Sequence, residues 1–179
     1  MSAEPKSKTP NILLFFTDQQ RPDSIGCYGQ PLPTTPHLDA MAARGTRFTH
    51  AFTPNPLCGP ARASLQTGRY PTATFNHINH TLLPPDTDTI AKHLAAAGYA
   101  TGYIGKWHLA SFGPRNGTDD VRTSPIPPGR RGGYRDFWLA ADALEFTSHG
   151  YGGRLFDADN REVAFDESVH RVDFMAERL

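Results

Sequence analysis

The sequence predicts an α/β fold with a mostly parallel sheet flanked by helices. Residues 11–16 (NILLFF) form a continuous apolar run of strand length, which is typical of a strand buried on both faces. Residues 88–98 carry a capped helical pattern, and a second strand-like segment follows at residues 99–104. A helix followed directly by a strand is the repeating unit of a parallel sheet with crossover connections.

Length and charge bound the classes of function. The 179 residues suit one domain or part of a larger one. Lys plus Arg number 18 and Asp plus Glu number 18, so no global field favours nucleic acid or an anionic membrane. No apolar run approaches the ~20 residues of a membrane span. Residues 1–10 are polar and lack a secretory signal's apolar core, so we expect a disordered tail and a cytoplasmic protein.

Other segments predict the remaining elements. Residues 35–45 read as a helix with Thr35 as N-cap and Gly45 as stop, and residues 46–52 alternate as a strand does. A Pro-, Gly- and Arg-rich loop is expected at 111–133, a strand or aromatic packing segment at 134–139, a hairpin turn at 157–162 and a helix at 166–179.

The position of Cys58 in the sequence suggests a chemical role more strongly than that of any other residue. Pro60 suits the first turn of a helix that ends at Gly68, so Cys58 lies at a helix N-terminus. Unpaired N–H groups favour an anion there, and Arg62 adds a cation one turn on. Such a thiol is a candidate for chemistry, although a lone cysteine is also common as a small buried apolar residue. Cys27 is expected to be structural.

Two further sites remain open on the residues alone. Asp18 follows the first predicted strand, where an acidic residue is either a metal ligand or a cap on the turn. Lys106 and His108 follow the strand at 99–104, where they are either functional or incidental surface polarity. His77 and His80 have a metal-like spacing but no third ligand nearby, so we assign them to loop structure or a pocket rim.

Two motifs resemble one enzyme family. Residues 57–69 (LCGPARASLQTGR) resemble the signature of type I sulfatases, in the alkaline-phosphatase-like superfamily, and residues 105–109 (GKWHL) resemble a second element of these enzymes. The resemblance is strongest over residues 11–109. It implies an alkaline-phosphatase-like fold, present here as a partial domain.

The resemblance also implies a mechanism. A formylglycine-generating enzyme would oxidise Cys58 to Cα-formylglycine, whose hydrate attacks the sulfur of an aryl or carbohydrate sulfate ester. Arg62 would orient the formylglycine, Lys106 would bind a sulfate oxygen, and His108 would help deprotonate the hydroxyl that expels sulfate.

The implied metal site departs from the family's commonest pattern. Sulfatases hold a divalent ion, commonly Ca²⁺, and the resemblance assigns Asp18, Gln19 and the modified Cys58 as ligands. Gln19 stands where a second aspartate is usual, which removes one negative charge. This substitution keeps two alternatives open: a phosphonate or phosphate ester hydrolase of the same superfamily, or a non-catalytic module that binds sulfated glycans with Cys58 as a thiol.

The end of the sequence predicts an incomplete domain. No stop signal follows the helical pattern at 166–179. We therefore expect residues 11–179 to be the N-terminal part of a sulfatase catalytic domain, truncated within a helix. Such a piece is expected to bind metal weakly and to turn over little or no substrate alone.

Overall fold

The structure is a computed structural model that describes residues 9–113, 117 and 119–179. It divides into two compact units, residues 1–51 and residues 52–179. Most of the tail expected at residues 1–10 lies outside the described residues, as do residues 114–116 and 118 of the predicted loop. Among the described residues, no helix combines the length and apolar character needed to cross a membrane.

The first unit is built from short helical segments. Two 3-10 turns, η1 (Pro22–Ser24) and η2 (Gly26–Tyr28), precede helix α1 (Pro36–Arg44). Thr35 and Gly45 bound α1 as predicted. Asp39 of α1 ties the helix to η2, because its carboxylate accepts a hydrogen bond from the Cys27 N–H at 2.6 Å.

Two predicted strands are wrong in this unit and at its border. Residues 11–16 form no strand, and all five of their apolar side chains are about half exposed or more. Residues 46–52 form bends and extended chain rather than a strand. A strand needs a neighbouring strand to receive its backbone hydrogen bonds, and neither segment has one in the described part of the chain. Apolar pattern alone could not supply that neighbour.

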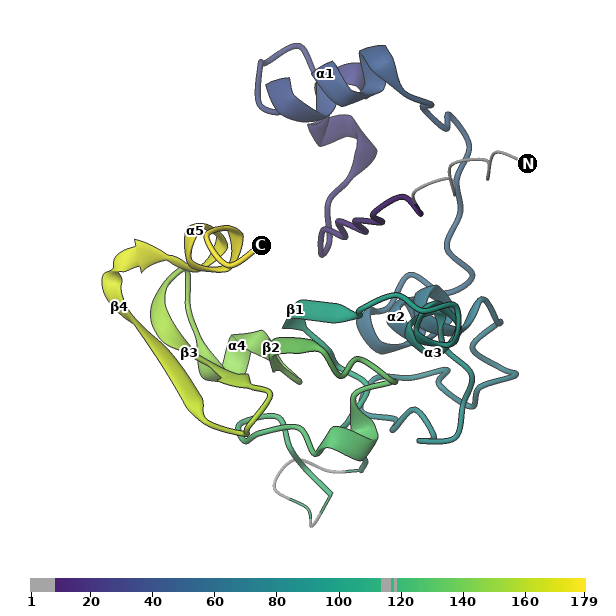
Figure 1. The fold of residues 1–179 in the computed structure, drawn as a ribbon. Helices are drawn as coiled ribbons and strands as arrows, with labels where there is room; N and C mark the ends of the chain where they lie inside the picture. Colours follow the sequence, from purple (N-terminus) through teal and green to yellow (C-terminus); the bar gives the residue numbers. More distant parts are fainter. Residues whose placement is uncertain (1–8, 114–116, 118) are drawn as a thin grey trace, which may run out of the picture. The chain divides into compact units, whose positions relative to one another are not determined.

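The second unit is a four-stranded sheet flanked by helices (Figure 1). The strand order is β1-β2-β3-β4, with β1 and β2 parallel and the other neighbours antiparallel. Its elements in chain order are α2 (Cys58–Thr67), α3 (Ile90–Ala96), β1 (Gly102–Lys106), η3 (Pro128–Arg130), β2 (Phe137–Ala141), α4 (Leu144–Thr147), β3 (Tyr151–Asp157), β4 (Glu162–His170) and α5 (Arg171–Ala176). The sheet is therefore mixed, with one parallel pair, rather than mostly parallel.

Strand β2 is buried on both faces and divides the core. Trp138 and Ala140 face a cluster that includes Ala63 of α2, whereas Leu139 and Ala141 face a cluster that includes Phe174 of α5. This alternation follows from the two-residue period of a strand. Helices α2 and α3 lie together on one side, and α5 lies beside the β3–β4 hairpin (Figure 1).

The hairpin between β3 and β4 confirms the turn predicted at residues 157–162. The Asp157 carboxylate accepts hydrogen bonds from the N–H groups of Asp159 and Arg161, and Asn160 takes the left-handed backbone that asparagine tolerates (φ 65°). The helix predicted at 166–179 is shorter than expected, because β4 continues to His170 and α5 spans only six residues. Pairing with β3 overrides the helical pattern in residues 166–170.

Candidate active site

Cys58 is the first residue of α2, so the predicted helix N-terminus is confirmed. Pro60 lies in the first turn, and Gly68 ends the helix in a left-handed conformation (φ 65°). The Leu57 N-cap supplies no side-chain hydrogen bond. Instead, Asn79 Oδ1 accepts a hydrogen bond from the Gly59 N–H at 2.8 Å, which pairs one of the N–H groups a helix start leaves open. Both Cys58 and Cys27 are free thiols.

The absence of a side chain at residue 59 lets three segments meet. A Cβ there would lie 3.2 Å from Asn79 Oδ1 and 3.6 Å from the carbonyl oxygen of His108. Glycine therefore allows the start of α2 to approach the loop at residue 79 and the GKWHL segment closely. The two sequence motifs, about 40 residues apart, are neighbours at this point.

Arg62 joins the same two motifs from within α2. Its side chain is buried, and Nη1 donates to the carbonyl oxygen of Lys106 at 2.5 Å and to the Tyr103 hydroxyl at 3.4 Å. The Tyr103 hydroxyl donates to the same carbonyl, and burial raises the pKa of Tyr103 to about 12, so it remains a donor at neutral pH. The positive charge next to Cys58 thus also fixes the end of β1.

His108 is a neutral base in this environment. It is 3 % exposed, and burial first, then the Lys106 ammonium, lowers its pKa to about 4. Its backbone is left-handed (φ 57°), an unusual conformation that is concentrated at functional sites. Neither ring nitrogen has a hydrogen-bond partner among the described residues. An imidazole held so can accept a proton from a group placed beside it.

His80 is a second imidazole in this region. Its ring centroid lies 5.3 Å from that of His108, and its backbone is also left-handed (φ 62°). Its Nδ1 is buried without a partner in the described part of the chain. Sequence reasoning placed His80 only in a loop or at a pocket rim, because its neighbour in space lies 28 residues further along the chain.

Lys106 ends β1 and forms an ion pair with Glu145 of α4. The Lys106 Nζ lies 3.2 Å from each carboxylate oxygen. Burial alone would raise the pKa of Glu145, but a hydrogen bond from its own backbone and the Lys106 ammonium together lower it. The carboxylate is therefore ionised at neutral pH. Sequence analysis did not select Glu145, because no motif contains it.

Asp142 is another residue that sequence analysis missed. It directly follows β2 and is completely buried. Its carboxylate accepts hydrogen bonds from the Ala110 N–H at 2.9 Å, the Ser111 N–H at 3.1 Å and the Ser111 hydroxyl at 2.5 Å. It therefore holds the chain just after His108. The signal that selected Asp18, an acidic residue after an apolar strand, also applies to Asp142 and could have found it.

The predicted metal ligands fit the metal only in part. Asp18 and Gln19 lie in a bend of the first unit, and Cys58 lies in the second. Carboxylate and amide oxygens are ligands that Ca²⁺ prefers, but the ion takes six to eight of them. In the described ranges, no group of three or more His, Cys, Asp or Glu side chains is arranged to hold a metal. Two oxygen donors with the right chemistry are thus present, without a complete site.

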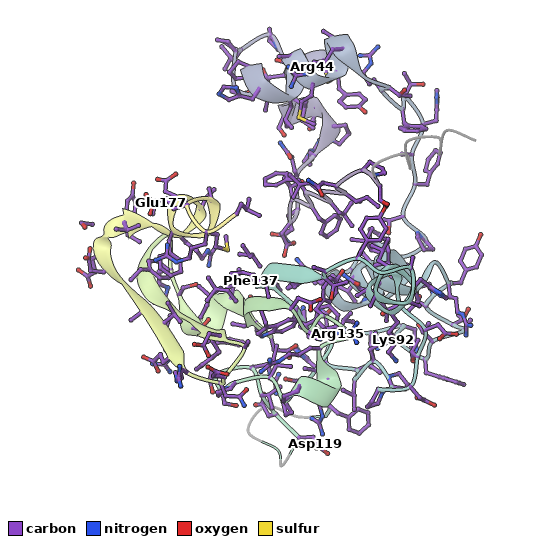
Figure 2. The ribbon with its side chains drawn as sticks, in the orientation of Figure 1. Arg44, Lys92, Asp119, Arg135, Phe137 and Glu177 are labelled. Carbon is purple, nitrogen blue, oxygen red and sulfur yellow. The ribbon has the colours of Figure 1, made fainter. Side chains whose placement is uncertain are left out.

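The Arg-rich loop serves the fold. Arg131 is buried, and its guanidinium donates to the carbonyl oxygens of Ile126 and Ala158 and to Asn160. A surface hollow of about 670 Å³ lies beside it, lined in part by Lys92 and Arg135, which Figure 2 labels. The Lys92 ammonium donates to two backbone carbonyls nearby. The Arg131 guanidinium is therefore engaged by groups of the fold itself.

Comparisons with known proteins converge on one family. A sequence model described as Sulfatase matches residues 10–158. The ulvan-active sulfatase of Formosa agariphila is 41% identical over 157 residues, covering 87% of this chain and 28% of that protein. Human arylsulfatase A is 45% identical over 109 residues, covering 58% of this chain and 22% of that protein.

Solved structures agree with the sequence relatives. A sulfatase YidJ structure from Bacteroides fragilis superposes with a TM-score of 0.77 at 29% identity, covering 93% of this chain and 38% of that one. The structure of BT4656 in complex with its substrate D-glucosamine-2-N,6-O-disulfate superposes with a TM-score of 0.76 at 28% identity, covering 96% of this chain and 30% of that one. The chain thus spans about a quarter of the length of its curated relatives. It belongs to the sulfatase family, and its fold is part of the alkaline-phosphatase-like fold.

Proposed function

We propose that a protein carrying these residues hydrolyses sulfate esters, with Cys58 converted to formylglycine as its nucleophile. The observation that carries this proposal is the meeting of the two motifs: Arg62, one turn after Cys58, donates to the Lys106 carbonyl, and Gly59 packs against the His108 carbonyl. Family membership supports it, since formylglycine and a divalent metal are typical of sulfatases. The relatives are several times longer, so we assign the activity to a chain longer than 179 residues.

Each site residue has a role that follows from its surroundings. Formylglycine, when formed, supplies a hydrated aldehyde at the start of α2. Arg62 holds the end of β1 and places positive charge beside that position. Lys106 presents an ammonium that can offset the charge of a sulfuryl group. His108, neutral and buried, can take the proton of a nearby hydroxyl.

The divalent metal would be held in part by Asp18 and Gln19. Bound there, a hard cation such as Ca²⁺ would supply further positive charge for the sulfuryl oxygens. Gln19 contributes a neutral amide oxygen, so this site carries one negative charge fewer than a pair of aspartates would. We also propose a cytoplasmic location and maturation by a separate formylglycine-generating enzyme.

Mass spectrometry across Cys58 tests the nucleophile directly. The protein is produced with and without a formylglycine-generating enzyme, and the peptide containing residue 58 is compared. We expect the mass of the aldehyde in place of the thiol only with that enzyme. An unmodified thiol, in a host that converts a control sulfatase, would contradict the proposal and favour the non-catalytic glycan-binding alternative.

Activity measurements separate the two hydrolase alternatives. We expect the matured protein to hydrolyse an aryl sulfate faster than the matching aryl phosphonate, and Cys58→Ala to abolish both activities. The names of the relatives favour a sulfate ester as substrate, whereas Gln19 is the feature that made a phosphonate ester the alternative. A higher kcat/KM for the phosphonate would show that the substrate class is wrong while the nucleophile is right.

A further inference from the structure

We propose that Glu145 determines specificity at the proposed sulfate-ester site by selecting neutral, hydroxyl-bearing groups beside the sulfate and disfavouring a second anionic group there. This inference rests on the proposed function, because it places the sulfate at Lys106. It adds a substrate class that the motifs do not indicate: monosulfated alcohols with neutral neighbours. The residue lies outside both motifs, on α4 after β2.

The geometry makes Glu145 the outer member of its ion pair. The Lys106 side chain is 11% exposed, whereas the Glu145 side chain is 51% exposed. Both carboxylate oxygens lie 3.2 Å from the Lys106 Nζ, so the carboxylate is held at the rim rather than free to turn away. A substrate that brings its sulfate to Lys106 from solvent therefore passes this carboxylate.

The chemistry of the pair allows the carboxylate and a sulfate to be present together. An ammonium has three N–H donors, so one cation can serve a carboxylate oxygen and a sulfuryl oxygen at once. An ionised carboxylate only accepts hydrogen bonds, so it favours a substrate hydroxyl and repels a sulfate or carboxylate group. The alcohol part of the substrate, which adjoins the sulfate, is the part that meets it.

A purely structural role for Glu145 predicts something different. If the carboxylate only held Lys106 in place, its loss would weaken the hydrolysis of every substrate by a similar factor. A specificity role changes the ratio between substrates instead. The ratio of kcat/KM values for a neutral and an anionic substrate therefore distinguishes the two roles.

The test compares two aryl sulfates that differ in one group. We would measure kcat/KM for 3-(hydroxymethyl)phenyl sulfate and 3-carboxyphenyl sulfate with the full natural chain, matured to formylglycine. The variant is Glu145→Gln, which keeps the size of the side chain and removes its charge. The matched control is Glu162→Gln: Glu162 is 52% exposed and ion-paired to Arg154, but it lies on β4, which β2 and β3 separate from the strand β1 that carries Lys106.

We expect the natural protein to prefer the hydroxymethyl substrate and Glu145→Gln to raise the relative kcat/KM of the carboxy substrate about tenfold, the effect of one like charge at close range. Glu162→Gln should leave the ratio unchanged. An unchanged ratio in Glu145→Gln would overturn the inference, even if both rates fell. No hydrolysis by the natural protein, or hydrolysis that persists in Cys58→Ala, would instead overturn the proposed function and this inference with it.

Discussion

Replacing Asp142 tests how the chain after His108 is held. Asp142→Ala removes the acceptor of three hydrogen bonds, from the Ala110 N–H, the Ser111 N–H and the Ser111 hydroxyl. All three donors belong to buried residues. The substitution leaves both backbone N–H groups without this partner, whereas the Ser111 hydroxyl still accepts from the Val121 N–H at 3.1 Å.

The expected cost follows from these bonds. An unsatisfied buried donor costs about 1–3 kcal/mol, so losing the acceptor of the two backbone donors would cost about 2–6 kcal/mol. Part of this is offset, because burial raises the pKa of Asp142 even against its hydrogen bonds, so the ionised carboxylate is itself costly to bury. We therefore expect Asp142→Ala to lower the free energy of unfolding by about 3–4 kcal/mol.

Equilibrium unfolding in urea measures this loss. The fluorescence of Trp107 and Trp138 is a suitable probe, because both rings are almost completely buried. Asp136→Ala is the control: Asp136 accepts hydrogen bonds from the N–H and hydroxyl of Thr101 at the other end of β2, but it is exposed. We expect the control to cost clearly less than Asp142→Ala, because water can replace the hydrogen bonds of an exposed carboxylate. A loss below about 1 kcal/mol for Asp142→Ala would refute the reasoning.

Two further predictions concern pH and backbone. The pKa of His108 is near 4 in the folded protein and near 6.5 when unfolded, so the unfolded state binds more protons between these values and stability rises with pH there. Asparagine tolerates the left-handed backbone, so His108→Asn should remove this contribution. The gain in unfolding free energy between pH 4 and pH 7 should then be smaller in the variant by up to about 3 kcal/mol, and an unaltered pH dependence would contradict the assigned pKa. Gly153→Ala should lower the free energy of unfolding by more than about 3 kcal/mol, since φ is 138° and the new Cβ would lie 2.3 Å from the Ser148 Cβ. Gly98→Ala, at φ 88° but with open space around the new Cβ, should lower it by about 1 kcal/mol. Similar thermal shifts for the two alanines would show that the clash at Gly153 is relieved cheaply.

The motifs at residues 57–69 and 105–109 were sufficient to identify the family and the start of helix α2. These features are local. The two ends of α2 follow from Pro60 and Gly68, and the turn between β3 and β4 follows from Asp157 and Asn160, because caps and turns depend on neighbours in sequence. The sequence alone also indicated Arg62, Lys106 and His108 through their resemblance to sulfatases.

Tertiary structure decided what depends on residues far apart in the chain. Residues 11–16 have the apolar pattern of a buried strand, yet they form no strand in the described structure, because a strand exists only with a partner strand that its own sequence does not specify. Asp142, Glu145 and His80 became candidates for the same reason. Their neighbours lie 28 to 39 residues away along the chain, and only the folded sheet brings a buried carboxylate, an ion pair and a second imidazole to the loop that contains His108.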